Sequence, residues 1–143
     1  MTDIDLPDVN VLVALLHPGH IHHSTAQGWF SKSERFATTA ITESGFLRLA
    51  LNPSVMGSRI RAADALTSLR SLRMDPRAEF LPDDSTLTNA QIDLVGLVGH
   101  KQVTDLHLVN LAASHHARLV TLDTKIKQTL TADDHIHVVT LAR

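Results

Sequence analysis

Short β-type runs alternate with longer stretches of helical period from one end of this chain to the other. Apolar and β-branched residues mark expected strands at residues 4–6, 36–39, 79–81, 118–122 and 137–141. The spacing of apolar residues predicts helices over 9–16, 23–32, 42–51, 59–72, 88–98 and 105–115. Because such alternation is typical of βαβ units, the sequence predicts an α/β fold with a central, mostly parallel sheet of about five strands flanked by helices.

Capping residues refine several of these boundaries. Ser58 is expected to cap the helix over 59–72, and Thr104 the helix over 105–115. Gly99 stands where a left-handed residue would close the helix over 88–98. The 143 residues contain no internal repeat or linker, so we expect a single domain over 1–143.

Composition excludes several classes of chemistry. The chain has no Cys, which removes disulfides, thiolate zinc sites, iron–sulfur clusters and thiol nucleophiles. Its formal charge of -2 gives no bulk attraction to nucleic acid or anionic lipid, and four Phe, one Trp and no Tyr make a base-stacking platform unexpected. Any resident metal must therefore be bound by oxygen or imidazole.

The beginning of the sequence has no feature of a targeting signal. Residues 1–8 hold three Asp and no basic residue, and the apolar run at 11–16 is far shorter than the roughly 20 residues that span a bilayer. The sequence therefore predicts a cytoplasmic protein that does not enter the membrane.

Four carboxylates occupy equivalent places in the expected fold. Asp8 and Asp123 directly follow strands, Glu43 lies just beyond the second strand, and Asp105 begins a helix. Parallel strands all end at one edge of the sheet, so these four side chains can converge in one crevice. No Lys or Arg adjoins them in sequence, and like charges that lie close together need a cation to stay ionised. Oxygen ligands without Cys favour Mg²⁺ or Mn²⁺.

A purely structural interpretation competes with this one. Acidic residues are favoured in the first turn of any helix by the helix dipole, and at helix caps by hydrogen bonding. That interpretation explains one such acid well, but it explains four at the same topological position less well.

Six segments, taken in order, resemble the motifs of PIN-domain ribonucleases, above all the VapC toxins of bacterial toxin–antitoxin pairs. They are residues 6–12 (LPDVNVL), 17–20 (HPGH), 41–48 (ITESGFLR), 81–84 (LPDD), 99–108 (GHKQVTDLHL) and 119–123 (LVTLD). No single segment is specific, but the ordered set spans nearly the whole chain. The resemblance implies a single PIN-like domain.

The resemblance also implies an activity and a site. It implies a Mg²⁺- or Mn²⁺-dependent endoribonuclease in which Asp8 and Asp105 match the direct metal ligands. Glu43 would complete the ligand set or orient a water, and Asp123 matches the most variable of the four family acids. The implied reaction is in-line hydrolysis of an RNA phosphodiester, which leaves a 5′-phosphate and a 3′-hydroxyl.

The same resemblance implies partners and accessory residues. Asn10 and Thr121 match polar residues beside the family site and are expected to contact the RNA substrate. A small VapB-like antitoxin that covers the acidic site and a toxin homodimer are implied as partners. Which RNA is cut does not follow from the residues.

Two further residues are candidate RNA contacts. Arg48 lies five residues beyond Glu43, and His107 follows Asp105 at the start of a helix. Residues two apart on a helix do not share a face, so a surface or capping role for His107 is the competing interpretation.

Two more clusters carry weaker signals. Residues 59–77 have a local charge of +3, and Arg59, Arg70 and Arg73 are spaced for one helical face, which is either a phosphate or partner contact or an ordinary solvated face. The histidine cluster at 17, 20, 22 and 23 has zinc-ligand residues, but it lies at a turn and lacks a partner motif, which favours a solvated loop.

Two other function classes remain as alternatives. A receiver-like signalling module would bind Mg²⁺ with paired acids after the first strand and use a Lys after its last strand, but Asp8 stands alone and no Lys follows Lys127. The other alternative is a PIN-like domain that has lost activity and only binds a partner.

Overall fold

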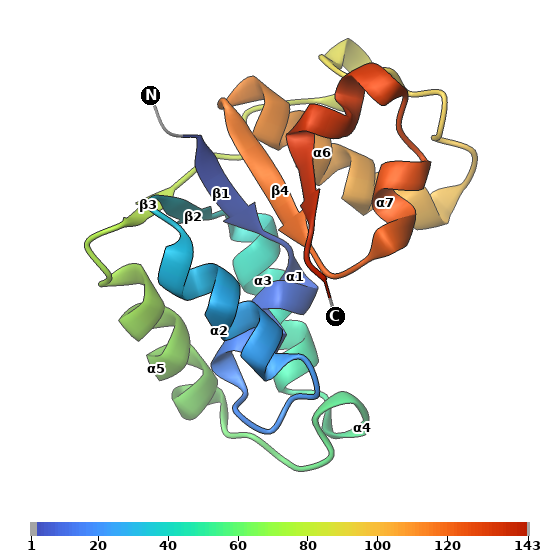
Figure 1. Cartoon of the computed structure of the whole chain (residues 1–143). Coiled ribbons are helices and arrows are strands. Elements are labelled where there is room, and N and C mark those ends of the chain that lie inside the picture. The colour runs from blue at the N-terminus through green and yellow to red at the C-terminus, as the bar shows by residue number, and fades with distance from the viewer. Residues whose placement is uncertain (1–2, 143) are drawn as a thin grey trace.

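A five-stranded, all-parallel sheet forms the centre of the protein in a computed structural model that describes residues 3–142 (Figure 1). The strand order is β3-β2-β1-β4-β5. The strands are β1 (Ile4–Pro7), β2 (Phe36–Thr38), β3 (Ala78–Phe80), β4 (Ala117–Thr121) and β5 (Val138–Thr140). All five expected strands are confirmed, and the sheet is parallel throughout rather than mostly parallel.

The strand order reverses direction between β1 and β4, which are neighbours in the sheet although most of the chain separates them. Four residue pairs join these strands, from Ile4 with Ala117 to Pro7 with Val120. Crossovers from β1 run to one side and crossovers from β4 to the other, which makes this pair a topological switch point. A crevice is expected outside the carboxyl ends of β1 and β4.

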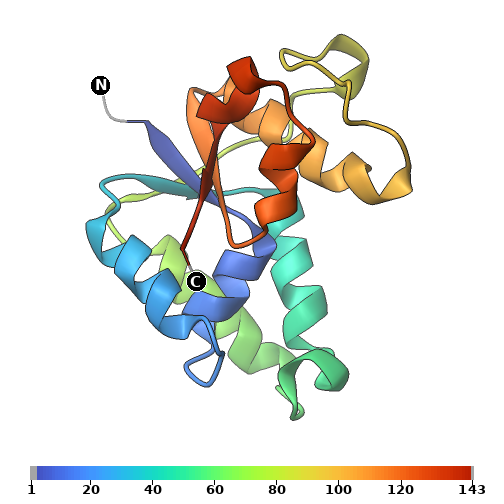
Figure 2. The same cartoon turned by 45° about the vertical axis from the view of Figure 1, so that its right-hand side comes forward.

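Helices cover both faces of the sheet (Figures 1 and 2). One core lies between the sheet and α6 with α7, and the second between the sheet and the earlier helices. The helices are α1 (Val9–Leu16), α2 (His23–Lys32), α3 (Ala40–Ala50), α4 (Pro53–Met56), α5 (Ala62–Arg73), α6 (Val103–Ser114) and α7 (Thr124–Gln128), with 3₁₀ turns η1 (Leu87–Asn89), η2 (His100–Gln102) and η3 (Ala132–His137).

The apolar helix α1 is buried because other elements surround it. It packs against α2, α3 and β4, and its residues 11–15 are all buried. Asp8 begins the helix by accepting a hydrogen bond from the Val9 backbone N–H. The burial of α1 therefore fixes the position of Asp8 beside the carboxyl end of β4.

The helix predicted over 88–98 is wrong. The segment contains only the single turn η1 (Leu87–Asn89), followed by irregular chain. Its backbone is held by side chains of other elements: Gln91 N–H donates to Asn110 Oδ1 at 2.7 Å, and Asp93 N–H donates to Asp134 Oδ2 at 2.8 Å. These long-range hydrogen bonds replace the helical ones that the sequence pattern predicted.

Several predicted boundaries are also wrong. The helix expected from residue 59 begins at Ala62, so Ser58 does not cap it. The third helix begins at Ala40, two residues before the predicted start, because Thr39 and Thr42 form a capping box there. Helix α6 begins at Val103, which places Thr104 inside the first turn instead of at the cap.

Gly99 is not the left-handed residue that the sequence predicted. Its φ is -168°, which is ordinary extended backbone. Within residues 3–142, the left-handed conformation occurs at Gly57, which closes α4, and at His116 after α6.

None of the helices in the described part of the chain has both the length and the apolar character required to cross a membrane.

Candidate functional site

The four predicted acids all lie at the carboxyl edge of the sheet. Asp8 directly follows β1, and Asp123 lies two residues beyond the end of β4, so both follow strands of the switch point. Glu43 and Asp105 lie in the first turns of α3 and α6. The topology thus delivers the predicted acids to one edge, although their side chains have different partners.

Asp8 is the most buried of the four, with 7% of its surface exposed. Its Oδ1 accepts from the Val9 N–H at 2.8 Å, and its Oδ2 accepts from Thr121 Oγ1 at 2.9 Å. Burial raises the pKa of the Asp8 carboxyl, the two hydrogen bonds oppose that rise, and the charge of Asp123 adds to it. Asp8 is therefore an oriented carboxylate that gains from a nearby cation.

Thr121 and Asn10 brace this carboxylate from the protein side. Thr121 Oγ1 donates to Asp8 and accepts from Asn10 Nδ2 at 3.2 Å and from the Asp123 N–H at 3.0 Å. The Leu122 N–H donates to Asn10 Oδ1 at 3.2 Å. The Thr121 hydroxyl is fully used by these three bonds and is completely buried. Its geometry favours the positioning of Asp8, and direct RNA contact by Asn10 and Thr121 stays a prediction.

Asp105 also has a raised pKa. Burial, together with the smaller effect of the charges of Asp8 and Asp123, raises the pKa of Asp105 to about 6. Asp123 caps α7 by accepting from the Lys125 N–H at 2.9 Å. The charges of the three aspartates therefore act on one another.

Glu43 is held by other partners. Its Oε2 accepts from Thr38 Oγ1 at 2.6 Å and lies 3.6 Å from Arg73 Nε. The Arg73 guanidinium in turn stacks on Phe80, 4.8 Å from the ring centroid. The sequence identifies Arg73 only as part of a basic segment. Its contact with Glu43 could not be predicted, because nothing in the sequence places α5 beside the start of α3.

The basic segment is arranged differently from the predicted single face. Arg59 precedes α5 and does not share its surface, so the predicted face of Arg59, Arg70 and Arg73 is wrong. Both Arg70 and Arg73 are exposed, but only Arg73 forms an ion pair with Glu43. One cation of this segment therefore belongs to the acidic site.

The carboxylate oxygens of the acidic site are ligands that suit a divalent cation. Within residues 3–142, no three His, Cys, Asp or Glu side chains converge closely enough to form a metal site by themselves. Mg²⁺ usually keeps several waters and takes few carboxylates together with substrate phosphate oxygens, so it does not need a complete protein cage. Carboxylate donors that raise one another's pKa fit Mg²⁺ or Mn²⁺.

A cavity of about 510 Å³ lies between the first turns of α3 and α6. Arg48 and His107 both line it, together with Ser44 and Thr104, the sequence neighbours of Glu43 and Asp105. Arg48 is exposed, whereas His107 Nε2 lies 2.7 Å from Asp83 Oδ1 and so also holds the chain after β3. The structure thus brings the two predicted RNA contacts to one groove.

The histidine cluster at residues 17–23 forms local contacts. The His22 N–H donates to His20 Nδ1 at 3.0 Å, and His23 Nδ1 lies 2.8 Å from the Ala14 carbonyl oxygen. Burial and the neighbouring histidines lower the pKa of His20. As in the rest of residues 3–142, no set of three metal-ligating side chains occurs here.

Comparison with known proteins agrees with this fold. The PIN domain family matches residues 6–130, so the class of protein defined here is a PIN-domain protein. Ribonuclease VapC38 of Mycobacterium tuberculosis is 44% identical over 120 residues, which cover 82% of this chain and 84% of the relative. Ribonuclease VapC39 of the same species is 41% identical over 130 residues, with 89% and 94% covered. The chain belongs to the VapC ribonucleases within the PIN-domain family.

Solved structures share the fold at low sequence identity. Mycobacterium tuberculosis VapC20, described as a Sarcin-Ricin loop cleaving toxin, aligns with a TM-score of 0.58 at 14% identity and covers 87% of this chain and 93% of its own. VapBC2 from Rickettsia felis, solved with a DNA fragment from the promoter, aligns with a TM-score of 0.58 at 15% identity, with 97% and 99% covered. These structures show the shared fold, and the ribonucleases that are 41–44% identical favour a nuclease over a receiver-like module.

Proposed function

We propose that this chain is a Mg²⁺- or Mn²⁺-dependent endoribonuclease, the toxin of a toxin–antitoxin pair. Asp8, Asp105 and Asp123 would hold the metal ion, and Glu43 would complete the ligand set or orient a water. The observation that carries the proposal is the mutual electrostatic coupling of the three aspartates at the switch point of the sheet. The identity to ribonucleases of the VapC type supports RNA as the substrate.

The bound ion would activate water and offset the charge that develops on the phosphate during in-line hydrolysis. The chain supplies the orientation. Thr121 and the Val9 N–H fix both oxygens of Asp8, and Asn10 keeps Thr121 in place. Glu43 would accept a proton from the attacking water, with its carboxylate held by Thr38 and Arg73. The proposed products have a 5′-phosphate and a 3′-hydroxyl.

The groove between α3 and α6 is the proposed path of the RNA strand. Arg48 offers an exposed guanidinium for a backbone phosphate, and His107 and Thr104 offer polar groups on the opposite wall. The lining residues adjoin Glu43 and Asp105 in sequence, so a strand in this groove would pass directly beside the acids.

The proposed partners follow from family membership. We propose a VapB-like antitoxin that covers the acidic site, a toxin homodimer, and action in the cytoplasm. An inactive PIN-like domain that only binds a partner is the remaining alternative, and the presence of all four acids argues against it.

The decisive experiment is RNA cleavage by purified protein with Mn²⁺, with Mg²⁺ and with a chelator. Cut sites are mapped on total RNA and the 5′ ends of the fragments are identified. Asp105→Asn should lower the rate by about 100-fold or more, because the charge that binds the cation is lost. Asp133→Asn removes an exposed Asp in η3 and serves as the matched control. Undiminished cleavage in chelator, or by Asp105→Asn, would refute the proposal.

A further inference from the structure

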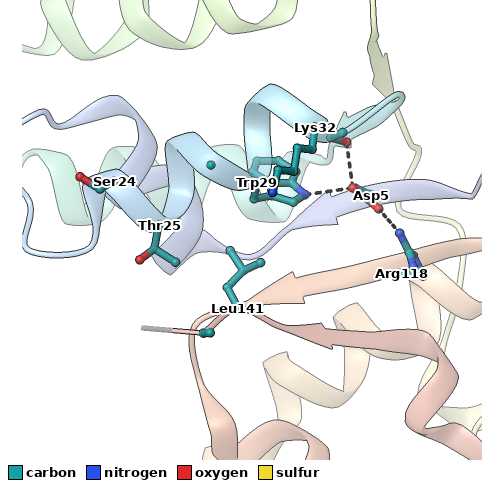
Figure 3. Close-up of a pocket in the computed structure, with 10 residues that line it drawn as sticks. Asp5, Ser24, Thr25, Trp29, Lys32, Arg118 and Leu141 are labelled. Carbon is teal, nitrogen blue, oxygen red and sulfur yellow. Dashed lines mark hydrogen bonds and ion pairs between the residues drawn. The ribbon is translucent and has the colours of Figure 1, made fainter.

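A pocket of about 520 Å³ that includes none of the four acids lies between α2, the strands β1 and β4, and the chain after β5 (Figure 3). Asp5 and Arg118 form its floor, and residues 141–142 form part of its rim. Asp5 and Arg118 lie near the amino-terminal ends of β1 and β4, whereas Asp8 and Asp123 lie beyond the carboxyl ends of these strands. The proposed nuclease chemistry uses none of its residues.

The carboxylate in the floor is already engaged. Asp5 Oδ2 accepts from Trp29 Nε1 at 2.9 Å and from Ser33 Oγ at 2.8 Å, and Asp5 Oδ1 accepts from Arg118 Nη2 at 2.9 Å. Asp5 has only 6% of its surface exposed. A ligand would therefore meet little acceptor capacity in this pocket, which argues against a cation.

Donors, in contrast, are in excess. Lys32 lines the pocket, is exposed and forms no ion pair within residues 3–142. Arg118 has a 40% exposed side chain, and its buried Nε has no hydrogen-bond partner. The hydroxyls of Ser24 and Thr25 also line the pocket and have no partner in the described part of the chain. Two cations against one engaged carboxylate leave a local charge of +1, which suits an anion with several acceptor oxygens.

Gly28 leaves one position of α2 that faces the pocket without a side chain. It lies in the interior of α2, where Gly is less stable than Ala, and it lines the pocket. A Cβ built on it would meet no atom within 4 Å, so no contact inside the protein requires a glycine there. A bare helix wall lets a ligand approach the backbone closely.

We propose that this pocket is a second, non-catalytic site that binds the phosphate of a nucleotide. Lys32, Arg118 and the two hydroxyls would hold the phosphate oxygens. The Trp29 ring and Leu141 would contact the sugar or the base. The volume lies within the range of about 300–1,000 Å³ that is usual for small-ligand sites. The phosphate could belong to a free nucleotide or to an RNA strand.

Trp29 makes the pocket directly observable, because it is the only Trp in the chain and its indole N–H donates to Asp5. We would titrate metal-free, ¹⁵N-labelled protein with adenosine 5′-monophosphate and follow the single indole N–H signal by NMR. A second titration would use a short single-stranded RNA and the Asp105→Asn protein, so that no cleavage occurs. The expected result is a saturable shift of the Trp29 signal with at least one of the two probes.

Two variants test whether the ligand binds in this pocket, and both leave Asp5 and Arg118 unchanged. Gly28→Leu fills the pocket from a wall that has room for the side chain and improves helix propensity, so the fold is retained. Lys32→Gln removes the unpaired charge. Each should weaken binding about tenfold, because a charge-assisted contact or the ligand volume is lost. Lys127→Gln on α7 removes one charge elsewhere and should leave the affinity unchanged.

Each outcome decides the proposal. A shift with the mononucleotide identifies a free-nucleotide site, and a shift with RNA alone identifies a strand contact. The proposal is wrong if neither probe moves the Trp29 signal, or if Gly28→Leu and Lys32→Gln bind as tightly as the parent protein. These titrations need no metal and no cleavage, so their failure leaves the proposed nuclease standing, and failure of the nuclease leaves them valid.

Discussion

Arg73 Nε lies 3.6 Å from Glu43 Oε2, so one of the four acids carries its own cation. Thr38 Oγ1 donates to the same oxygen at 2.6 Å, and the Arg73 guanidinium stacks on the Phe80 ring. The three aspartates have no comparable ion pair within residues 3–142. The site thus divides into an uncompensated aspartate cluster and a compensated glutamate.

This division predicts that Arg73 weakens metal binding. Arg73→Gln removes one positive charge from the edge of the acidic site, and a unit charge at several ångströms in a partly exposed site contributes about 1 kcal/mol. We therefore expect Mn²⁺ to bind the variant about three- to tenfold more tightly by isothermal titration calorimetry. Arg70→Gln removes an exposed Arg of the same helix and should change the affinity little. Equal or weaker Mn²⁺ binding by Arg73→Gln would contradict the prediction.

The raised pKa of Asp105 predicts a pH-dependent stability. Its pKa rises from 3.8 to about 6 in the folded protein, so the folded state binds the proton more tightly than the unfolded chain. The free energy of unfolding therefore falls as pH rises from 3.8 to about 6 and stays lower above that range. Without metal at pH 7.5, Asp105→Asn should be about 1–2 kcal/mol more stable than the parent protein, a value reduced for solvent screening.

Denaturant unfolding in chelator at pH 4 and pH 7.5 measures this effect. The free energies of unfolding of the parent protein and Asp105→Asn should differ little at pH 4, where Asp105 is protonated. Asp133→Asn should be as stable as the parent protein at both pH values. Saturating Mn²⁺ should reverse the order at pH 7.5, because only the parent protein gains the full binding energy. A variant that is less stable than the parent in chelator at pH 7.5 would show that Asp105 is not repelled by its neighbours.

Because the Thr121 hydroxyl positions Asp8, we expect its removal to lower the rate of RNA cleavage. Thr121→Val keeps the shape of the side chain but leaves Asp8, Asn10 and the Asp123 N–H without their shared partner. Loss of a residue that orients a metal ligand typically costs about 10- to 100-fold in activity or metal affinity. RNA cleavage rates at saturating and limiting Mn²⁺ provide the measurement, and Thr121→Ser should restore most of the loss. Parent-like rates for Thr121→Val would show that Asp8 is held by α1 alone.

The sequence predicted the parts of the site that depend on topology. The alternation of strands and helices placed Asp8, Glu43, Asp105 and Asp123 at one edge, and the parallel sheet brings them there. It did not predict that Arg73 pairs with Glu43, because that contact depends on how α5 packs against α3. Pairing between residues thirty positions apart leaves no periodic signal.

The helix prediction for residues 88–98 is wrong for a related physical reason. Its apolar spacing fits a helix, but Asn110 of α6 and Asp134 of η3 accept hydrogen bonds from two of its backbone N–H groups. Such side-chain hydrogen bonds compete with helix formation, and only the packed fold makes them available. The pocket at Asp5 was missed as well, since the residues that form it come from α2, β1, β4 and the chain after β5.

Gly96 provides a direct test of this irregular segment. A Cβ at this position would lie 2.0 Å from the Thr129 carbonyl oxygen, which is backbone and cannot rotate away. In a helix over 88–98, Gly96→Ala would be stabilising, whereas in the observed packing it should cost about 1–3 kcal/mol of unfolding free energy. Denaturant unfolding measures the difference, with Gly28→Ala as the control, because a Cβ at Gly28 meets nothing within 4 Å and should stabilise α2. A Gly96→Ala protein as stable as its parent would mean that residues 94–98 do not pack on the end of α7.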